Sequence, residues 1–153
     1  MQQFWKTVLE PLLSAVRPRT LVEVGSWKGD NTRRLIAWCA REGARLHVIE
    51  PAPDYDIAEL RRQVGDALIH HTTLSLHGLS LIDAPDLVLI DGDHNWYTVF
   101  HELELLDRRA REGGWPFPVV VLHDVGWPYG RRDLYYNPET IPEEYRHPHR
   151  RAG

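Results

Sequence analysis

The stretch Leu21-Val-Glu-Val-Gly-Ser-Trp-Lys-Gly29 decides the fold of this chain. A short β-branched strand runs into a turn that glycine residues punctuate, and the turn opens a helix. About twenty residues later, Glu50 follows a second apolar run. This order and spacing are typical of a parallel sheet that holds a nucleoside-bearing molecule at the carboxyl ends of its strands.

Strand-like and helix-like patterns alternate along the rest of the chain. The run at residues 86–90 is continuously apolar, as in a strand buried on both faces. Such alternation indicates an α/β fold with a parallel sheet and right-handed crossovers. Strands are expected at residues 20–24, 46–49, 68–74, 86–90 and 119–122. Helices are expected at residues 4–16 with a kink or restart at Pro11, from a cap at Asp30 or Asn31 to Gly43, through 57–64 to Gly65, and along an apolar face from Trp96 through Phe100 to Ala110.

Size and composition restrict the classes of function. A chain of 153 residues suits one domain with a single core. Its net charge of −4 provides no electrostatic basis for binding nucleic acid, so no such partner is expected. The apolar segment 4–16 is interrupted by Lys6 and Glu10 and is too short to span a bilayer. Cys39 is the only cysteine, which favours a reducing, cytoplasmic location.

The first motif identifies a family. Glu23-x-Gly25-x-x-x-Gly29 resembles motif I of the class I S-adenosylmethionine (SAM) methyltransferases. The resemblance implies a Rossmann-like sheet of strand order 3-2-1-4-5, with the turn and its Ser26 near the aminoacyl end of SAM. It also implies that Glu23 helps bind the amino group and that Glu50 accepts hydrogen bonds from the ribose, because a carboxylate offers two acceptor oxygens to a diol. The alternative is that the two glycines only form a strand-to-helix turn.

Polar side chains also follow the fourth and fifth expected strands. The fourth closes as Asp91-Gly-Asp-His94 and the fifth as His123-Asp124. Because the carboxyl ends of parallel strands meet at one edge of a sheet, we expect these side chains to converge beside the proposed cofactor.

These two motifs resemble a group of metal-assisted O-methyltransferases that act on sugars and natural products. The resemblance implies that Asp91 and Asp124 bind a divalent metal, with Asp91 also near SAM and with His94 or His123 as general base or further ligand. Oxygen ligands favour Mg²⁺. Structural alternatives stay open: Asp91 caps a helix or satisfies loop amides, His94 is a structural hydrogen-bonding residue, or His123 orients Asp124.

Two further residues have both a ligand-binding and a structural interpretation. Ser75, at the end of the third expected strand, contacts the adenine or merely forms a turn. Trp27 lines the cofactor pocket or packs in the core, and we expect core packing.

Beyond the SAM-binding domain expected at residues 1–124, periodicity disappears. Residues 125–153 are rich in Pro, Tyr and Arg, and we expect either a lid over the acceptor site or a surface wrap without a ligand. Methyltransferases of this class continue after the fifth strand with a helix and a hairpin. Without them the strand 119–122 is an exposed edge, so we expect a homo-oligomer through this edge or coverage by the tail. The tail residues that we expect to contribute most are Tyr129, Arg131, Arg132 and Tyr135.

The combined motifs predict a SAM-dependent O-methyltransferase, metal-assisted, that acts on a hydroxyl of a small or sugar-like molecule. Two other functions stay open. One is a truncated methyltransferase-like domain that serves as a scaffold, with or without bound SAM, and the other is a metal-dependent hydrolase. The residues do not name the acceptor.

Overall fold

The computed structural model describes residues 1–94 and 96–125 of the chain. Five parallel strands form one sheet in the order β3-β2-β1-β4-β5. The α/β class and the strand order 3-2-1-4-5 are therefore confirmed. The strands are β1 (Thr20–Val24), β2 (Arg45–Ile49), β3 (Leu68–His71), β4 (Leu87–Ile90) and β5 (Val119–Leu122).

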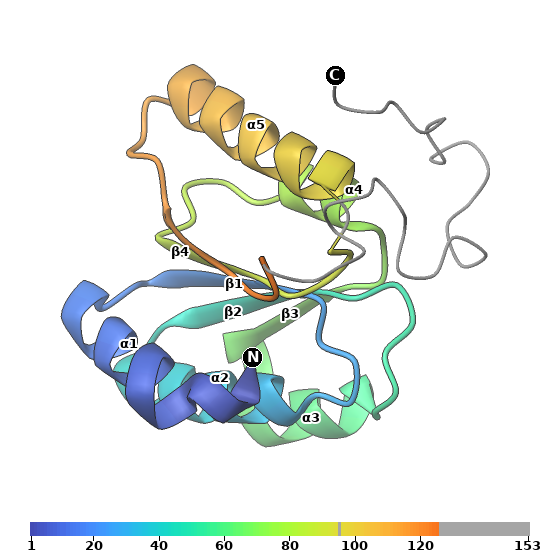
Figure 1. Ribbon diagram of the computed structural model, residues 1–153. Helices are drawn as coiled ribbons and strands as arrows, with labels where there is room; N and C mark the ends of the chain where they lie inside the picture. The colour runs from blue at the N-terminus through green and yellow to red at the C-terminus, as the bar shows by residue number, and fades with distance from the viewer. Residues whose placement is uncertain (95, 126–153) are drawn as a thin grey trace.

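Helices cover both faces of this sheet. The helices α1, α2 and α3 lie on one face, and α4 and α5 lie on the other (Figure 1). Each face has its own apolar cluster, because alternate residues of the buried strands point to opposite sides. The helices are α1 (Glu10–Val16), α2 (Asp30–Glu42), α3 (Ile57–Val64), α4 (Ser75–Ser80) and α5 (Trp96–Gly113), with short helical turns at Gln2–Phe4, Trp5–Leu9 and Gly65–Ala67.

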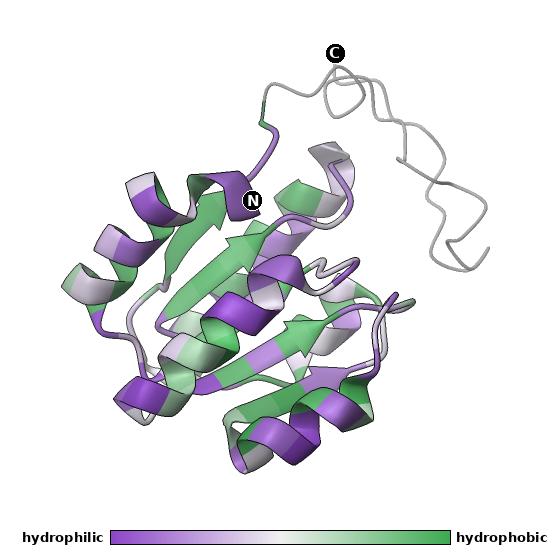
Figure 2. Ribbon diagram, turned by 90° about the horizontal axis from the view of Figure 1, so that it is seen from below, coloured by the Kyte–Doolittle hydropathy of each residue, from purple (hydrophilic) through white to green (hydrophobic). Residues whose placement is uncertain are grey.

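The hydropathy pattern explains this layering. The strands are mainly hydrophobic, whereas the helices carry both hydrophobic and hydrophilic residues (Figure 2). The strand β4 is buried along its whole length, as its apolar run predicts. The sheet therefore forms the centre of the core.

Several expected helix boundaries are confirmed. The segment 4–16 is helical, and Pro11 stands in the first turn of α1, directly after a π-helical turn at Trp5–Leu9. Gly43 and Gly65 follow the last residues of α2 and α3. A cap at Asp30 or Asn31 is wrong, because Gly29 is the N-cap of α2 and both residues lie inside the helix.

The third strand and the last helix need correction. The third strand ends at His71, and Ser75 begins the helix α4 instead of ending that strand. The apolar face expected along α5 is only partly buried: Trp96 and Phe100 are 47% and 45% exposed. Their rings stack at a centroid distance of 5.1 Å. The fully buried face of α5 instead includes Glu102.

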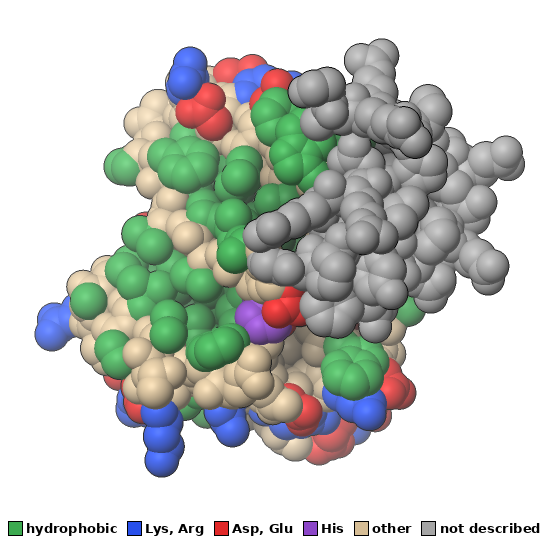
Figure 3. Space-filling view, viewed as in Figure 1, with side chains coloured by type: hydrophobic (Ala, Val, Ile, Leu, Met, Phe, Trp, Pro, Cys, Tyr) green, Lys and Arg blue, Asp and Glu red, His purple; other side chains and the backbone are tan. Residues whose placement is uncertain are grey.

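The strand β5 forms one edge of the sheet within the described residues. Val119 is 41% exposed, and Phe117 just before it is 50% exposed. On the N-terminal segment, Phe4 and Val8 are exposed as well. Figure 3 shows apolar side chains gathered over the left half of this side of the molecule, with Lys and Arg side chains at its margin.

Two further expectations, on a membrane span and on the tail, can be compared only with the residues that the structure describes. Among the described residues, no helix combines the length and apolar character that a membrane span requires. The tail residues Tyr129, Arg131, Arg132 and Tyr135 lie outside the described residues.

Candidate functional site

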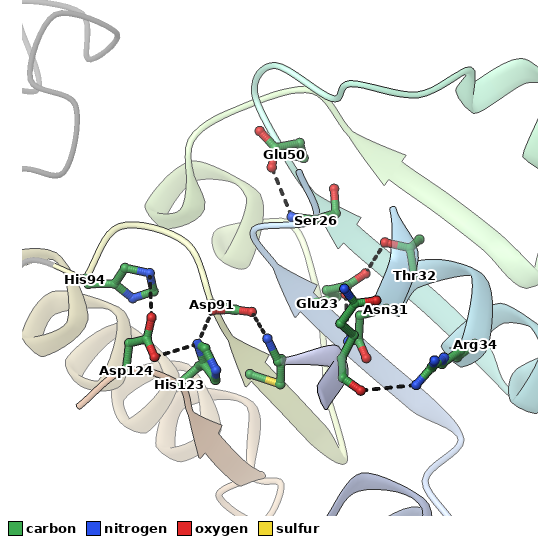
Figure 4. A network of polar contacts seen from close by, with 12 residues as sticks. Glu23, Ser26, Asn31, Thr32, Arg34, Glu50, Asp91, His94, His123 and Asp124 are labelled. Carbon is green, nitrogen blue, oxygen red and sulfur yellow. Dashed lines mark hydrogen bonds and ion pairs between the residues drawn. The ribbon is translucent and has the colours of Figure 1, made fainter. Parts of the chain in front are cut away.

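The carboxyl ends of β1, β2, β4 and β5 meet at one edge of the sheet (Figure 4). Gly25, which follows β1, brings the first turn against the end of β4. It has a φ of +80°, and a Cβ there would lie 2.4 Å from the carbonyl oxygen of Asp91. Only glycine permits this backbone approach. The sequence predicts the turn, and the structure adds that Gly25 makes room for the neighbouring strand end.

Glu23 is a buried carboxyl group behind this turn. Asn31 Nδ2 donates to it at 2.9 Å and Thr32 Oγ1 donates at 2.6 Å. Burial raises the pKa of Glu23 to about 7, against the lowering effect of these two hydrogen bonds; Asp91 raises the pKa further. Glu23 therefore ties the first turn of α2 to β1. Asn31 and Thr32 are partners that the sequence reasoning missed.

Glu50 holds the glycine turn from the neighbouring strand. Its Oε2 accepts hydrogen bonds from the backbone N–H groups of Ser26 and Trp27, both at 3.0 Å. Its Oε1 accepts one from the N–H of Ala52 at 3.0 Å. Oε2 therefore uses both of its lone pairs on the turn, whereas Oε1 keeps one with which Glu50 can accept a hydrogen bond from a ligand.

Tyr55 is a component of the turn that the sequence reasoning missed. Its hydroxyl lies 2.9 Å from Ser26 Oγ. Its ring lies against Gly29, where a Cβ would be 2.9 Å from the Tyr55 Cδ1 atom. A tyrosine shortly after the acidic residue of the second strand was the only sequence signal for this contact.

The second group consists of Asp91, His123 and Asp124. His123 Nδ1 lies 2.7 Å from Asp91 Oδ1 and 3.2 Å from Asp124 Oδ1. One ligand atom from each residue lies within 4.8 Å of the others, a spacing that suits one metal ion. The expected convergence of the two strand ends is thus present.

The orientation of His123 distinguishes this group from an ordinary hydrogen-bonded cluster. Both ring nitrogens are buried, and neither has a partner with hydrogen-bond geometry among the described residues. Nδ1 is thus close to two carboxylates without donating well to either. Buried polar atoms are nearly always satisfied, so such an atom requires an explanation, and a role in binding a cation is one. His94 approaches from the other side, with its Nε2 3.8 Å from Asp124 Oδ2.

Asp124 has a special backbone conformation. Its φ is 53°, in the left-handed region that aspartate tolerates better than most residues. The bend directly follows β5 and His123. It helps to bring the carboxylate back toward its neighbour.

An ammonium group also contacts Asp91. The N-terminal nitrogen of Met1 lies 2.8 Å from Asp91 Oδ2 and is almost completely buried. Its charge also lowers the pKa of Glu23. The space between these two carboxyl groups therefore accommodates a cation. Close by, the Phe4 ring lies 5.8 Å from that of His123.

Ser75 lies apart from these two groups, at the start of α4. Its hydroxyl is near Glu102 of α5 and lowers that carboxyl group's pKa, but burial outweighs this effect and raises the pKa to about 8. Neither oxygen of Glu102 has a partner with hydrogen-bond geometry among the described residues. Glu102 is a buried acid that the sequence reasoning missed, since it stands within an apolar helical pattern.

The expectation that Trp27 packs in the core is wrong. Its side chain is 69% exposed, at the rim of the glycine turn. The ring contacts Lys28, whose Nζ lies 4.5 Å from the ring centroid.

Comparisons with known proteins assign the chain to a family. Residues 22–125, more than half of the chain, match a family model described as a methyltransferase domain. No curated protein is significantly similar to the chain. A solved structure of the Burkholderia thailandensis 1,6-didemethyltoxoflavin-N1-methyltransferase, with bound 1,6-didemethyltoxoflavin and S-adenosylhomocysteine, is similar with a TM-score of 0.49 and 16% identity. The similarity covers 64% of this chain and 43% of that one, so the chain spans less than half of its length.

Proposed function

We propose that this chain, which belongs to the methyltransferase domain family, is a SAM-dependent methyltransferase that methylates a hydroxyl group of a small or sugar-like molecule with the help of a divalent metal. One observation carries the proposal. A glycine turn held by Glu50 and a cluster of Asp91, His123 and Asp124 lie at the same edge of the sheet. Methyl transfer requires the donor and the activated acceptor to be held next to each other, and two neighbouring sites at one edge of the sheet would do this.

The donor would lie along the glycine turn. Glu50 would accept a hydrogen bond from the ribose hydroxyls with the remaining lone pair of Oε1. The aminoacyl end would lie near Gly25, Ser26 and Gly29, and its ammonium group near Glu23 and Asp91. The buried Met1 ammonium 2.8 Å from Asp91 supports this last assignment, because the same kind of group already lies there. Ser75 is proposed at the adenine end.

The metal would be held by Asp91 and Asp124, with His123 as a third ligand. The buried and unsatisfied Nδ1 of His123 between two carboxylates fits a cation. Carboxylate oxygens favour Mg²⁺, and one imidazole nitrogen also permits Mn²⁺. A bound divalent ion lowers the pKa of an acceptor hydroxyl and holds its oxygen in place.

His94 is then the proposed general base. His123 faces the two carboxylates, whereas His94 Nε2 lies 3.8 Å from Asp124 Oδ2, at the border of the cluster. A histidine there can accept the hydroxyl proton near neutral pH. Such help is typically worth about 10²–10⁴-fold in rate.

Transfer from radiolabelled SAM to a panel of small hydroxyl compounds, including sugars and catechols, tests the proposal. We expect transfer with Mg²⁺ or Mn²⁺ and its loss in EDTA. Asp107→Asn, on the exposed side of α5, is a control that should retain activity. Donor binding without transfer to any compound would favour the scaffold function, and release of a hydrolysed product without SAM would favour a hydrolase.

We also propose that the chain forms a homo-oligomer through the β5 edge. Edge strands with apolar side chains and unpaired backbone groups tend to associate. The exposed Phe117 and Val119 support this interface. Sedimentation analysis should give a dimer, and Val119→Lys should give a monomer. A monomeric wild-type chain would contradict the proposal.

A further inference from the structure

Trp27 combines two features that folding alone does not explain. Its backbone has a φ of 45°, in the left-handed region, where a bulky side chain is strained. Its side chain is nevertheless 69% exposed, so core packing does not offset the strain. Strained residues of this kind persist where the surroundings hold them, and they cluster at ligand sites.

The surroundings that hold Trp27 belong to the candidate donor site. Its N–H donates to Glu50 Oε2 at 3.0 Å. Its carbonyl oxygen accepts a hydrogen bond from the N–H of Asp54 at 2.9 Å. Both partners lie in the segment that follows β2. The backbone of Trp27 is therefore held by the same carboxylate that we assign to the ribose.

The indole itself exposes a large apolar surface to solvent. Lys28 is the cation at its ring, 4.5 Å from the centroid. An exposed tryptophan at the rim of a site offers a rigid apolar wall at a small cost in side-chain entropy. A flat, partly apolar ligand beside Glu50 would cover this surface.

We propose that Trp27 is a donor-binding residue whose indole covers the nucleoside end of the methyl donor, next to the ribose on Glu50. This inference rests on the proposed function. Glu50 recognises the polar side of the nucleoside, and the indole excludes water from its other side. In this left-handed backbone conformation the Trp27 side chain is exposed at the turn.

Calorimetric titration of the full chain with S-adenosylhomocysteine and with 5′-methylthioadenosine tests the proposal. The second ligand keeps the nucleoside and lacks the aminoacyl group. We expect Trp27→Ala and Trp27→Gly to bind both ligands at least about tenfold more weakly, as the loss of an aromatic contact implies. Trp27→Phe keeps an aromatic ring and should retain affinity within about threefold.

The two small substitutions separate binding from folding. Trp27→Gly relieves the left-handed strain, so it should unfold at a higher temperature than Trp27→Ala while binding equally weakly. Phe117→Ala removes a similarly exposed aromatic ring at the opposite end of the strands and should bind as the wild type does.

Three results would overturn the inference. Wild-type affinity in Trp27→Gly would show that the ring has no role in binding. Equal losses in the Phe and Ala variants would assign the effect to the turn rather than the ring. If the wild type binds neither ligand, both the inference and the proposed function fail, whereas binding that is insensitive to Trp27 overturns the inference alone.

Discussion

The two halves of the site differ in how well their polar groups are satisfied. In the glycine turn, Glu23 accepts two side-chain hydrogen bonds and Glu50 accepts three from backbone N–H groups. At the ends of β4 and β5, His123 is buried beside Asp91 and Asp124, and its ring nitrogens have no partner with suitable geometry among the described residues. The two carboxylates of the turn are thus satisfied without a ligand, although the buried Oδ1 of Asn31 has no partner among the described residues, whereas His123 leaves both ring nitrogens unsatisfied.

This difference assigns different roles to the two regions. A satisfied turn is a preorganised surface, so a donor can bind there without rearranging it. A cluster of two carboxylates and an unsatisfied imidazole instead gains from a cation, since the cation relieves the repulsion between the carboxylates. Mutations should therefore affect mainly folding in the turn and mainly ligand binding at the strand ends.

The largest effect is expected at Gly25, where the two regions touch. Gly25→Ala would place a Cβ 2.4 Å from the Asp91 carbonyl oxygen, which cannot move without displacing β4. We expect a loss of at least about 3 kcal/mol in the free energy of unfolding. Urea denaturation measures it. Gly43→Ala shares the positive φ, in the left-handed region, but its Cβ would lie no closer than 3.9 Å to another atom, so it should cost only about 1–2 kcal/mol. Equal effects would show that the close approach is unimportant.

The next effect concerns the cation. Asp91→Asn and Asp124→Asn should each weaken Mn²⁺ binding by about 100-fold or more, because each removes a charged ligand. Electron paramagnetic resonance of free Mn²⁺ measures the affinity. Stability should change little or increase in Asp124→Asn, since one of two neighbouring negative charges is lost, but it should fall in Asp91→Asn, which also loses the ion pair with the Met1 ammonium. Wild-type Mn²⁺ affinity in both variants would contradict the proposed metal site.

Two buried carboxyl groups, Glu102 and Glu23, should make the stability of the fold depend on pH. Burial raises the pKa of Glu102 to about 8 and that of Glu23 to about 7, so both bind protons more tightly in the folded chain than in the unfolded chain. Stability from these groups is present below about pH 4.5 and is lost as the pH rises toward 8. Glu102→Gln should remove part of this loss and stabilise the fold by about 1–2 kcal/mol at pH 8.

Glu23→Gln is the matched comparison. Its new amide N–H₂ would replace one of the two acceptor oxygens and so face either Asn31 Nδ2 or Thr32 Oγ1, and it should not stabilise the fold as Glu102→Gln does. Thermal unfolding from pH 5 to 8 measures both variants. A steeper pH dependence in Glu102→Gln than in the wild type would contradict the assignment.

The smallest effect is expected for Glu50→Gln. The change keeps one acceptor oxygen for the turn but removes the charge, so the affinity for S-adenosylhomocysteine should fall about tenfold and stability by about 1 kcal/mol. Glu42→Gln, at the exposed end of α2, controls for the change in net charge. Calorimetry that finds equal affinity for both variants and the wild type would show that Glu50 only supports the turn.

The alternation of patterns predicts most of the fold because strands buried on both faces need apolar runs, and Val119–Leu122 and Thr20–Val24 appear with the expected bounds. It also predicts that Asp91, His123 and Asp124 converge, since parallel strands end at one edge. Periodicity misplaced Trp96 and Phe100, because an apolar residue on a helix is not necessarily on the buried face.

Contacts between segments that are far apart in the sequence could not be predicted from it. Tyr55 lies on Gly29 and the Met1 ammonium lies on Asp91, and both contacts depend on loop paths that no local pattern encodes. Trp27 was expected in the core. The expectation failed because an aromatic residue between two glycines gives no sign, in the sequence, of its backbone conformation. The left-handed φ of Trp27 is visible only in the structure.

The central claim is that the satisfied glycine turn is a donor site. Calorimetric titration of the full-length chain with S-adenosylhomocysteine tests it most directly, because the product binds without turnover. We expect saturable binding of one molecule per chain, weakened about tenfold or more in Glu50→Ala. No detectable binding, or equal binding by the wild type and Glu50→Ala, would contradict the claim.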